Sequence, residues 1–237
     1  MKAITVQQPF AFEILSGEKS IEVKDWDTLH RGDLLICSSG KPAFSTEEME
    51  EIEEEYGTAF LYGYALCVVR LEDVRLMRQG DEEPALEDEI DPEAYSWVIS
   101  DVRPVIPFPV KGKKGVFEVE DKLVEISPFK YDDSVVAKSG TRAVELGLDF
   151  SDWHGRTSDI IVTEEGEPRV HVVWDSLSLR QIPVSVIEKC VKEGFDWTGV
   201  LMRLTEIEHA EPRDTWDDVQ DVLDAIVEEN PTLFEDL

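Results

Sequence analysis

Hydrophobic and polar positions alternate with a period of two in the first half of the chain, or form short apolar runs, and both patterns predict β-strands. The expected strands are residues 2–7, 20–26, 34–40, 60–71, 95–99, the proline-broken edge 103–110, and 116–119. One early helix is expected from Gln8-Pro9 to Gly17, because Phe10, Ile14 and Leu15 recur at helical spacing. Such a series predicts a small β-barrel with an early helix.

The pattern restarts after Pro128. Strands are expected at residues 134–138, 158–163, 169–174, 177–182 and 198–207, with residues 164–168 as a turn and a helix from Pro183 to Gly194. A final helix is expected after Asp214, and its apolar stripe is Trp216, Val219, Leu223 and Ile226. The fold class is therefore predicted as mainly β with α (α+β): a barrel domain at 1–122, a linker near 121–128, and an SH3-like barrel with a terminal helix at 128–237.

Two acidic stretches interrupt the strands of the first half. Residues 46–56 contain seven glutamates, with Thr46 as the expected N-cap, and read as a solvated helix. Residues 79–93 contain eight acids and no base, and are expected to be a flexible loop that is solvated by water.

The chain is strongly acidic, with a formal net charge of −30. Non-specific nucleic-acid binding depends on Lys and Arg side chains that neutralise phosphates. The acidic composition therefore excludes extended electrostatic binding to a duplex, but it does not exclude binding of a nucleic acid in a local pocket. The acid excess also suits a halophilic source with a salt-rich cytosol, or solubility alone. The only dense basic cluster is Lys111-Gly112-Lys113-Lys114-Gly115.

Cysteine and histidine spacing points to no metal site. Cys37, Cys67 and Cys190 form no CxxC pair, and the four histidines lack ligand spacing. No phosphate loop, dinucleotide fingerprint or nucleophile elbow occurs in the sequence, so no cofactor is expected. No stretch reaches the ~20 apolar residues of a membrane span, and a cytoplasmic protein without a membrane partner is expected.

One stretch in the first half concentrates candidate chemistry. If residues 20–26 form a strand, Ile21 and Val23 face the core, whereas the other face carries Ser20, Glu22, Lys24 and Trp26. Lys19 enters from the preceding turn. This face suits a planar polar ligand, with the indole for stacking and the charged groups for hydrogen bonds, or it is a solvated strand face with an exposed ion pair.

Several short motifs, in order, resemble the ASCH domain, a relative of the PUA RNA-binding fold, over about residues 2–119. They are Gln8-Pro9-Phe10, Gly17-x-Lys19-x-x-Glu22-x-Lys24, Trp26, Arg31-Gly32, Leu35-Ile36 leading to Ser39, and Tyr95-x-Trp97-Val98. Lys24 stands where the family usually has an arginine, and Glu22 stands where its amidohydrolases carry a threonine.

The resemblance implies a cleft between the helix and the barrel that binds RNA or nucleosides. Carried over by position, Lys19, Glu22 and Lys24 are the polar or catalytic centre. The expected ligand-binding residues around this centre are Gln8, Ser20, Trp26, Ser39 and Trp97. In a hydrolase, Lys19 would assist a nucleophile such as the hydroxyl of Ser20 or Ser39, and Glu22 would act as general acid or base.

Three functions follow from these observations. The leading hypothesis is a protein that binds RNA or a modified nucleoside in the ASCH cleft. The first alternative is a small hydrolase, a ribonuclease or nucleoside amidohydrolase, that uses the same cleft. The second is a protein-interaction module, with a protein partner for the C-terminal domain. The sequence leaves the ligand and the oligomeric state open.

Overall fold

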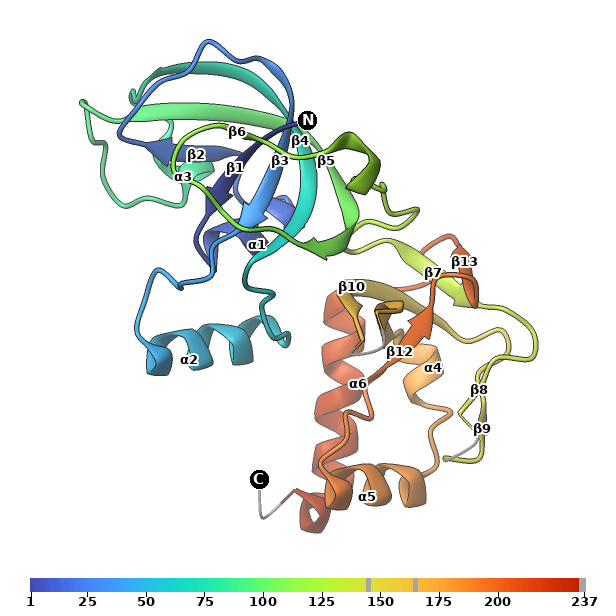
Figure 1. Cartoon of the computed structure of the whole chain (residues 1–237). Helices are drawn as coiled ribbons and strands as arrows, with labels where there is room; N and C mark the ends of the chain where they lie inside the picture. The colour runs from blue at the N-terminus through green and yellow to red at the C-terminus, as the bar shows by residue number, and fades with distance from the viewer. Residues whose placement is uncertain (144–145, 164–165, 235–237) are drawn as a thin grey trace. The chain divides into compact units, whose positions relative to one another are not determined.

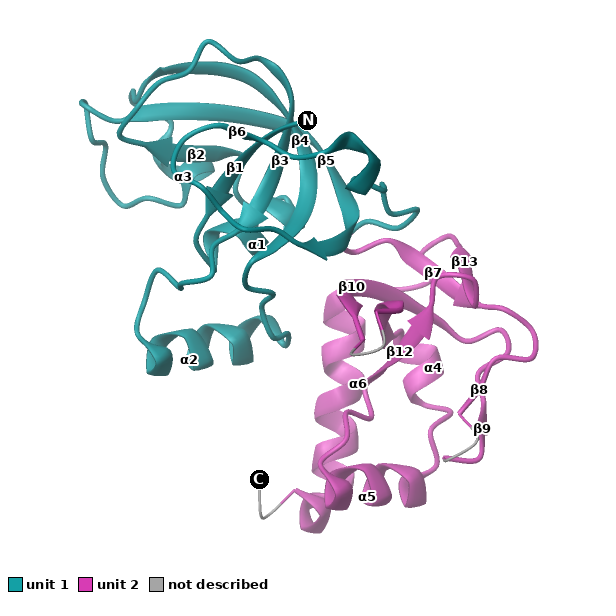
Figure 2. Cartoon of the chain, viewed as in Figure 1, with its two compact units in different colours: residues 1–130 teal, residues 131–237 magenta. Residues whose placement is uncertain are grey.

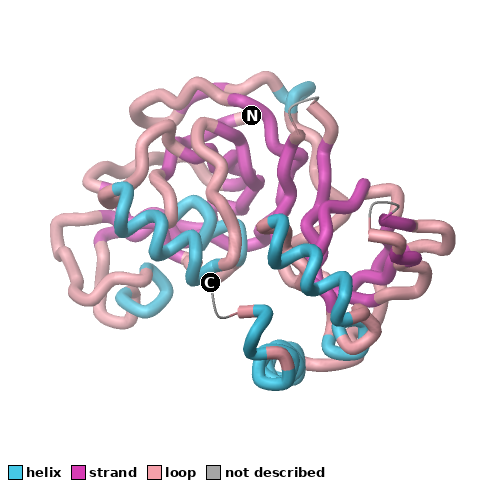
Figure 3. Tube along the Cα trace, turned by 90° about the horizontal axis from the view of Figure 1, so that it is seen from below, coloured by secondary structure: helices cyan, strands magenta, loops and turns pink. Residues whose placement is uncertain are grey.

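A computed structural model of the chain describes residues 1–143, 146–163 and 166–234. The chain divides into two compact units, Met1–Lys130 and Tyr131–Leu237, which Figure 2 shows in different colours. Each unit mixes helices and strands, which Figure 3 distinguishes by colour, so the fold class is α+β as the sequence predicts.

Unit 1 contains one six-stranded sheet in the order β2-β5-β4-β3-β1-β6 (Figure 1). Its strands are β1 (Lys2–Val6), β2 (Ile21–Lys24), β3 (Gly32–Ser38), β4 (Tyr64–Leu76), β5 (Tyr95–Pro109) and β6 (Phe117–Glu118). Its helices are α1 (Phe10–Ser16), α2 (Thr46–Tyr56), α3 (Glu82–Ala85) and the 3-10 turn η1 (Asp121–Leu123). β1 runs parallel to β3, and the other paired strands are antiparallel.

Both faces of β3 are buried, which explains its nearly continuous apolar run. Leu34 and Ile36 pack into one core cluster with residues of α1, whereas Leu35 and Cys37 pack into a second cluster with Phe117. A strand that is covered on one face only would alternate between apolar and polar residues. The apolar run therefore reflects the burial of β3 on both faces.

The acidic stretches differ from the sequence prediction in two details. Helix α2 covers residues 46–56 as expected, but its N-cap is Ser45, whose hydroxyl accepts a hydrogen bond from the Glu48 N–H in a capping box. The expected flexible loop at residues 79–93 instead contains α3, and Asp81 in it is 4% exposed. Asp81 accepts hydrogen bonds from the Arg75 guanidinium and from the Ser96 hydroxyl, which fix the stretch against the sheet.

Residues 95–109 form the single strand β5, where the sequence predicted two elements. Its first part pairs with β2 on one side, while β4 pairs along its length on the other. The proline-rich part meets only a short segment on its free side, where Val105 bridges Ile126. Residues 121–128, the expected linker, therefore pack within unit 1, and Ser127 is buried there.

Unit 2 contains a five-stranded sheet in the order β12-β11-β10-β7-β13 and a separate hairpin of β8 and β9 (Figure 1). The strands are β7 (Ser134–Ala137), β8 (Arg142–Ala143), β9 (Leu148–Asp149), β10 (His154–Val162), β11 (Pro168–Trp174), β12 (Gly199–Arg203) and β13 (Ile207–His209). The helices are α4 (Ser176–Leu179), α5 (Val184–Glu193), α6 (Trp216–Glu229) and the 3-10 turn η2 (Pro231–Leu233). Phe150, Trp153 and Trp174 form an aromatic cluster in its core.

Two strand predictions in unit 2 were wrong. Residues 177–182 begin as helix α4, because the Asp175 carboxylate caps it by accepting from the Ser178 N–H. Residues 198–207 do not form one strand, because β12 ends at Arg203 and β13 begins at Ile207. The first two residues of the expected turn at 164–168 lie outside the described residues. The final helix is present, capped by Thr215 instead of Asp214, and the SH3-like assignment stays a prediction.

Candidate functional site

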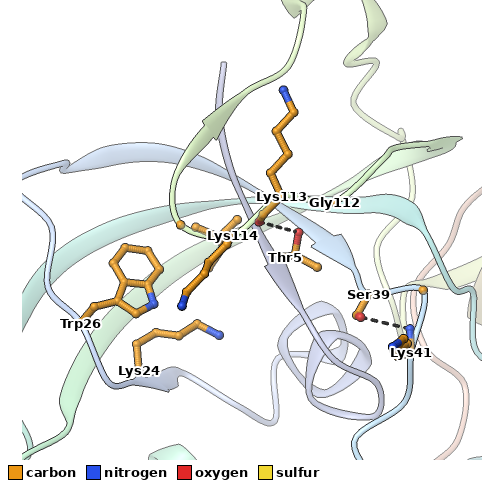
Figure 4. A pocket seen from close by; sticks show the side chains of 11 residues that line it. Thr5, Lys24, Trp26, Ser39, Lys41, Gly112, Lys113 and Lys114 are labelled. Carbon is orange, nitrogen blue, oxygen red and sulfur yellow. Dashed lines mark hydrogen bonds between the residues drawn. The ribbon is translucent and has the colours of Figure 1, made fainter.

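A pocket of about 590 Å³ opens on unit 1 and gathers side chains from four segments (Figure 4). It is lined by Ile4, Thr5, Lys24, Trp26, Ser39, Gly40, Lys41, Gly112, Lys113, Lys114 and Gly115. Four of these residues are lysines, and no residue in this lining set is acidic. In a chain with a net charge of −30, this composition marks a local cationic site.

The curvature of the sheet creates this pocket. β2 and β6 are the two edges in the strand order, yet Lys24 at the end of β2 and residues 112–115 before β6 line the same cavity. The sheet therefore curls until its edges approach each other, as in a small barrel. The loop lies so close to β1 that a Cβ at Gly112 would stand 2.7 Å from Oγ1 of Thr5, which explains the glycine there.

The lysines differ in their surroundings. The Lys24 ammonium lies 2.6 Å from the Glu22 carboxylate, and both side chains are largely buried. Lys114 points toward Lys24 and Trp26, whereas the side chain of Lys113 points away and its ammonium lies 5.9 Å from the Phe117 ring centre (Figure 4). Lys41 and Lys114 are exposed, and neither forms an ion pair with an acid among the residues that the structure describes.

Trp26 is the aromatic group of the pocket, and Trp97 holds it in place. The two rings meet edge to face with centroids 4.7 Å apart, and the Trp97 indole N–H donates to the Trp26 carbonyl at 3.2 Å. Trp97 is 0% exposed and belongs to the barrel core. The expectation that Trp97 contacts the ligand is therefore corrected: Trp97 packs against Trp26 from the core side.

Lys19 does not reach the pocket. It is 2% exposed, its ammonium donates to the Ala85 carbonyl, and the same group lies 5.1 Å from the Phe10 ring centre. No ion pair joins Lys19 to Glu22 in the described part of the chain. Glu22 pairs with Lys24 instead, and the charge of Lys19 lowers the pKa of the neighbouring Glu13.

Glu13 is a buried acid that the sequence analysis did not single out. It lies on the buried face of α1, and its Oε2 atom has no hydrogen-bond partner among the described residues. Burial raises the pKa of Glu13 to about 7, and the charge of Lys19 offsets only part of that rise.

We expect Glu13→Gln to stabilise the protein at high pH. Since the folded pKa lies above the unfolded value, the protonated carboxyl stabilises the fold below about pH 4.5, and this stability is lost as the pH rises toward 7. The variant should be more stable than the parent at pH 8 by up to about 3 kcal/mol. Urea unfolding at pH 4 and pH 8 measures this, and an equal difference at both pH values would contradict the assignment.

Two further predicted residues lie outside the pocket. Gln8 is 1% exposed, and its side-chain amide accepts from the Phe12 N–H and donates to the Leu61 carbonyl, so it fixes the start of α1 instead of lining a cleft. Ser20 is exposed, its N–H donates to the Pro84 carbonyl, and it is absent from the lining set.

The structure brings together Lys24, Trp26 and Ser39 of the predicted site, with Glu22 directly behind Lys24. Sequence reasoning missed Thr5, Lys41, Lys113 and Lys114 as members of the site. The basic cluster at 111–115 was the available signal for the last two, because it is the only such cluster in an acidic chain.

Within the described residues, no group of three or more His, Cys, Asp and Glu side chains is arranged to hold a metal ion. The same residues include no helix with the length and apolar character needed to cross a membrane.

Residues 4–109 match the family model of the ASCH domain. This segment is an ASCH domain. The pocket residues from Ile4 to Lys41 lie inside the ASCH domain, whereas residues 112–115 lie just beyond it.

Curated relatives of the chain share part of its sequence. Activating signal cointegrator 1 of Mus musculus is 27% identical over 131 residues, which cover 51% of this chain and 22% of the mouse protein. The same values hold for Activating signal cointegrator 1 of Homo sapiens. The chain therefore spans about a fifth of the length of these relatives.

Solved structures of an ASCH protein from Zymomonas mobilis are similar to the chain. A serine-to-alanine variant is 11% identical with a TM-score of 0.35, over 52% of this chain and 96% of its own. The unaltered protein is 12% identical with a TM-score of 0.32, over 51% of this chain and 88% of its own.

Proposed function

We propose that the ASCH domain binds a short segment of single-stranded RNA in the pocket beside Trp26. The observation that supports this proposal is the pocket lining, which includes four lysines, one indole and no acid, on a chain that is otherwise strongly acidic. The ammonium groups of Lys41 and Lys114 have no acidic partner among the described residues, whereas Lys24 pairs with Glu22 and Lys113 points toward Phe117. Lysine neutralises phosphates, and an aromatic side chain stacks on any base. The combination suits a ligand that has both groups.

The charge of the remaining surface limits the length of the RNA. Helix α2 contributes seven glutamates to unit 1, and the chain as a whole carries −30. A long polyanion would be repelled outside the pocket, whereas a few nucleotides place their phosphates only on the lysines. A bare nucleoside leaves the cationic groups without a partner.

The polar groups of the pocket suit a ribose. The Ser39 hydroxyl accepts from the Lys41 N–H at 3.1 Å, and its own hydrogen remains able to donate. Thr5 adds a second hydroxyl, which donates to the Lys113 carbonyl at 3.5 Å and leaves its oxygen able to accept. A 2′-hydroxyl both donates and accepts, so such partners distinguish RNA from DNA. A volume of about 590 Å³ lies in the range of small-ligand sites.

The hydrolase alternative loses its expected centre. It requires Lys19 and Glu22 beside the ligand, but the Lys19 ammonium is buried against the Ala85 carbonyl. The Glu22 carboxylate is engaged by Lys24. We therefore propose binding without cleavage at this pocket.

Fluorescence anisotropy with a labelled RNA decamer of mixed sequence tests the proposal. We expect single-stranded RNA to bind more tightly than the matched DNA strand, and the RNA duplex to bind most weakly. With about three phosphates neutralised, the logarithm of the binding constant should fall with a slope of about −2 against the logarithm of the salt concentration. Absence of RNA binding, or binding that is independent of salt, would contradict the proposal.

A further inference from the structure

Unit 2 contains a hydrogen-bonded serine, histidine and aspartate that lie apart in the sequence. Oγ of Ser158 on β10 lies 2.7 Å from Nδ1 of His171 on β11, and Nε2 of the same imidazole lies 3.1 Å from the Asp196 carboxylate. Ser158 and His171 are half-buried, and Asp196 is exposed, so solvent reaches the group.

The hydrogen-bond chemistry fixes the direction of this relay. An ionised carboxylate only accepts hydrogen bonds, so Nε2 of His171 carries the proton that Asp196 accepts. In the neutral imidazole the Nδ1 atom is then an acceptor, and the Ser158 hydroxyl donates to it. The histidine is therefore placed to take the proton of the serine, as a general base does for a nucleophile.

The surrounding structure supports this geometry. The ladder between β10 and β11 shifts register between Thr157 and Asp159, which leaves Ser158 in a β-bulge beside His171. Bulges re-aim side chains and are frequent next to active sites. On the other side, a Cβ at Gly199 would stand 2.7 Å from Nε2 of His171, so glycine at this position of β12 admits the ring.

Asp196 is itself held in position. Oδ1 of its carboxylate accepts from both the N–H and the hydroxyl of Thr198, each at 2.7 Å, while Oδ2 faces His171. Partial burial alone would raise the pKa of Asp196, but the hydrogen bonds from His171 and Thr198 outweigh it and lower the pKa. The carboxylate is thus ionised at neutral pH and orients the imidazole through one oxygen.

We propose that Ser158, His171 and Asp196 form an acyl-transfer site that hydrolyses an uncharged carboxylic ester. This activity is independent of the RNA pocket in unit 1. Leu201 lies opposite His171 on β12 and is 47% exposed, so an apolar acyl group has a surface beside the imidazole. Asp159 follows the serine in the chain and Asp196 contacts its histidine, so the charge near the group disfavours anionic substrates.

The reaction uses only the ester and water. The Ser158 oxygen bonds to the carbonyl carbon while its proton passes to Nδ1 of His171. The adduct then expels the alcohol, which takes this proton and leaves an acyl-serine. Water attacks the acyl-serine, again with His171 as base, and releases the carboxylic acid with restoration of the serine hydroxyl. Asp196 stays ionised and stabilises the imidazolium.

The test treats the full chain with a fluorophosphonate probe, locates the adduct by peptide mass spectrometry, and follows hydrolysis of p-nitrophenyl butyrate. We expect an adduct on Ser158, ester hydrolysis above the rate in buffer, and loss of both in Ser158→Ala. His171→Ala should slow both by about 100-fold, the scale of a general base. Absence of an adduct on Ser158, or an unchanged hydrolysis rate in Ser158→Ala, would overturn the proposal.

Two further variants separate chemistry from structure. Ser151 is the control serine, because its hydroxyl donates a hydrogen bond to the Asp149 carboxylate and contacts no imidazole among the described residues. Ser151→Ala should therefore keep labelling and hydrolysis at the parent rate. Asp196 is a positioning residue, and Asp196→Asn should shift the midpoint of the pH dependence of labelling to lower pH, because the imidazolium loses its carboxylate. An unchanged midpoint would remove Asp196 from the relay. Thermal melting of each variant identifies any that fails to fold.

Discussion

The double variant Lys41→Gln/Lys114→Gln should bind the single-stranded RNA decamer about 100-fold more weakly than the parent. Each lysine lines the pocket and is exposed, and neither has an acidic partner in the described part of the chain, so each ammonium is available to a phosphate. A charge-assisted hydrogen bond contributes about 1.4 kcal/mol or more, which is tenfold for each lysine. Anisotropy titrations at one salt concentration measure the loss.

A matched control for this prediction exists within unit 1. Lys2 pairs with Glu118 and Lys122 pairs with Glu120, and neither lysine lines the pocket. Lys2→Gln/Lys122→Gln makes the same change in net charge. It should alter RNA affinity by less than about threefold, because neither ammonium lies at the pocket and exposed ion pairs contribute little to the stability of the fold. Equal losses in the two double variants would mean that RNA senses only the overall charge.

Asp81→Ala should be the most destabilising of the substitutions considered in unit 1, at about 3 to 5 kcal/mol. Asp81 is buried and accepts two hydrogen bonds from the Arg75 guanidinium, at 2.5 and 2.7 Å, and one from the Ser96 hydroxyl at 2.7 Å. Without the carboxylate, the guanidinium and the 0% exposed serine lose their partner. Urea unfolding at pH 7 measures the loss.

The loss of stability in Asp81→Ala should depend on pH, because the pKa of Asp81 is lowered in the folded protein. The hydrogen bonds from Arg75, which exceed the opposing effect of desolvation, hold the pKa of Asp81 well below its usual range. Because the pKa of Asp81 is lower in the folded state, its carboxylate stabilises the fold at pH values above its unfolded pKa, which is near 4. This stabilisation is lost as the pH falls below that value. The parent and Asp81→Ala should therefore converge in acid. The control Asp88→Ala removes an exposed acid of the same stretch and should cost less than about 0.5 kcal/mol.

The local spacing of apolar residues predicted most of the fold, because most helices and strands bury one face whose apolar residues recur at a regular interval in the sequence. Helix α2 covers the expected residues, since Met49 is its buried apolar position and Gly57 ends it. Residues 177–182 were assigned wrongly because their alternation imitates a strand, while the deciding contact is the cap by Asp175. The stretch 79–93 was predicted to be a loop because its high charge suggests solvation. Charge alone does not reveal that Asp81 is buried and pairs with Arg75.

The candidate site was only partly predictable, and the reason is the closure of the sheet. Lys24 and Trp26 are neighbours in one strand pattern, so the sequence places them together. Lys114 follows them by some 90 positions and meets them only because β6 and β2 are the two edges of a curled sheet. Lys19 was misplaced because spacing does not show whether a lysine at a turn points outward or toward a buried carbonyl.

The most direct test of the account is an amide and indole NMR spectrum of the full chain, recorded during titration with the RNA decamer. We expect the largest shifts at Thr5, at the Trp26 indole, at residues 39–41 and at residues 112–115. The NMR signals of unit 2 should shift little. Shifts that centre on Gln8, Ser20 and their neighbours, or on unit 2, with the pocket signals unchanged, would contradict the assignment of the RNA site.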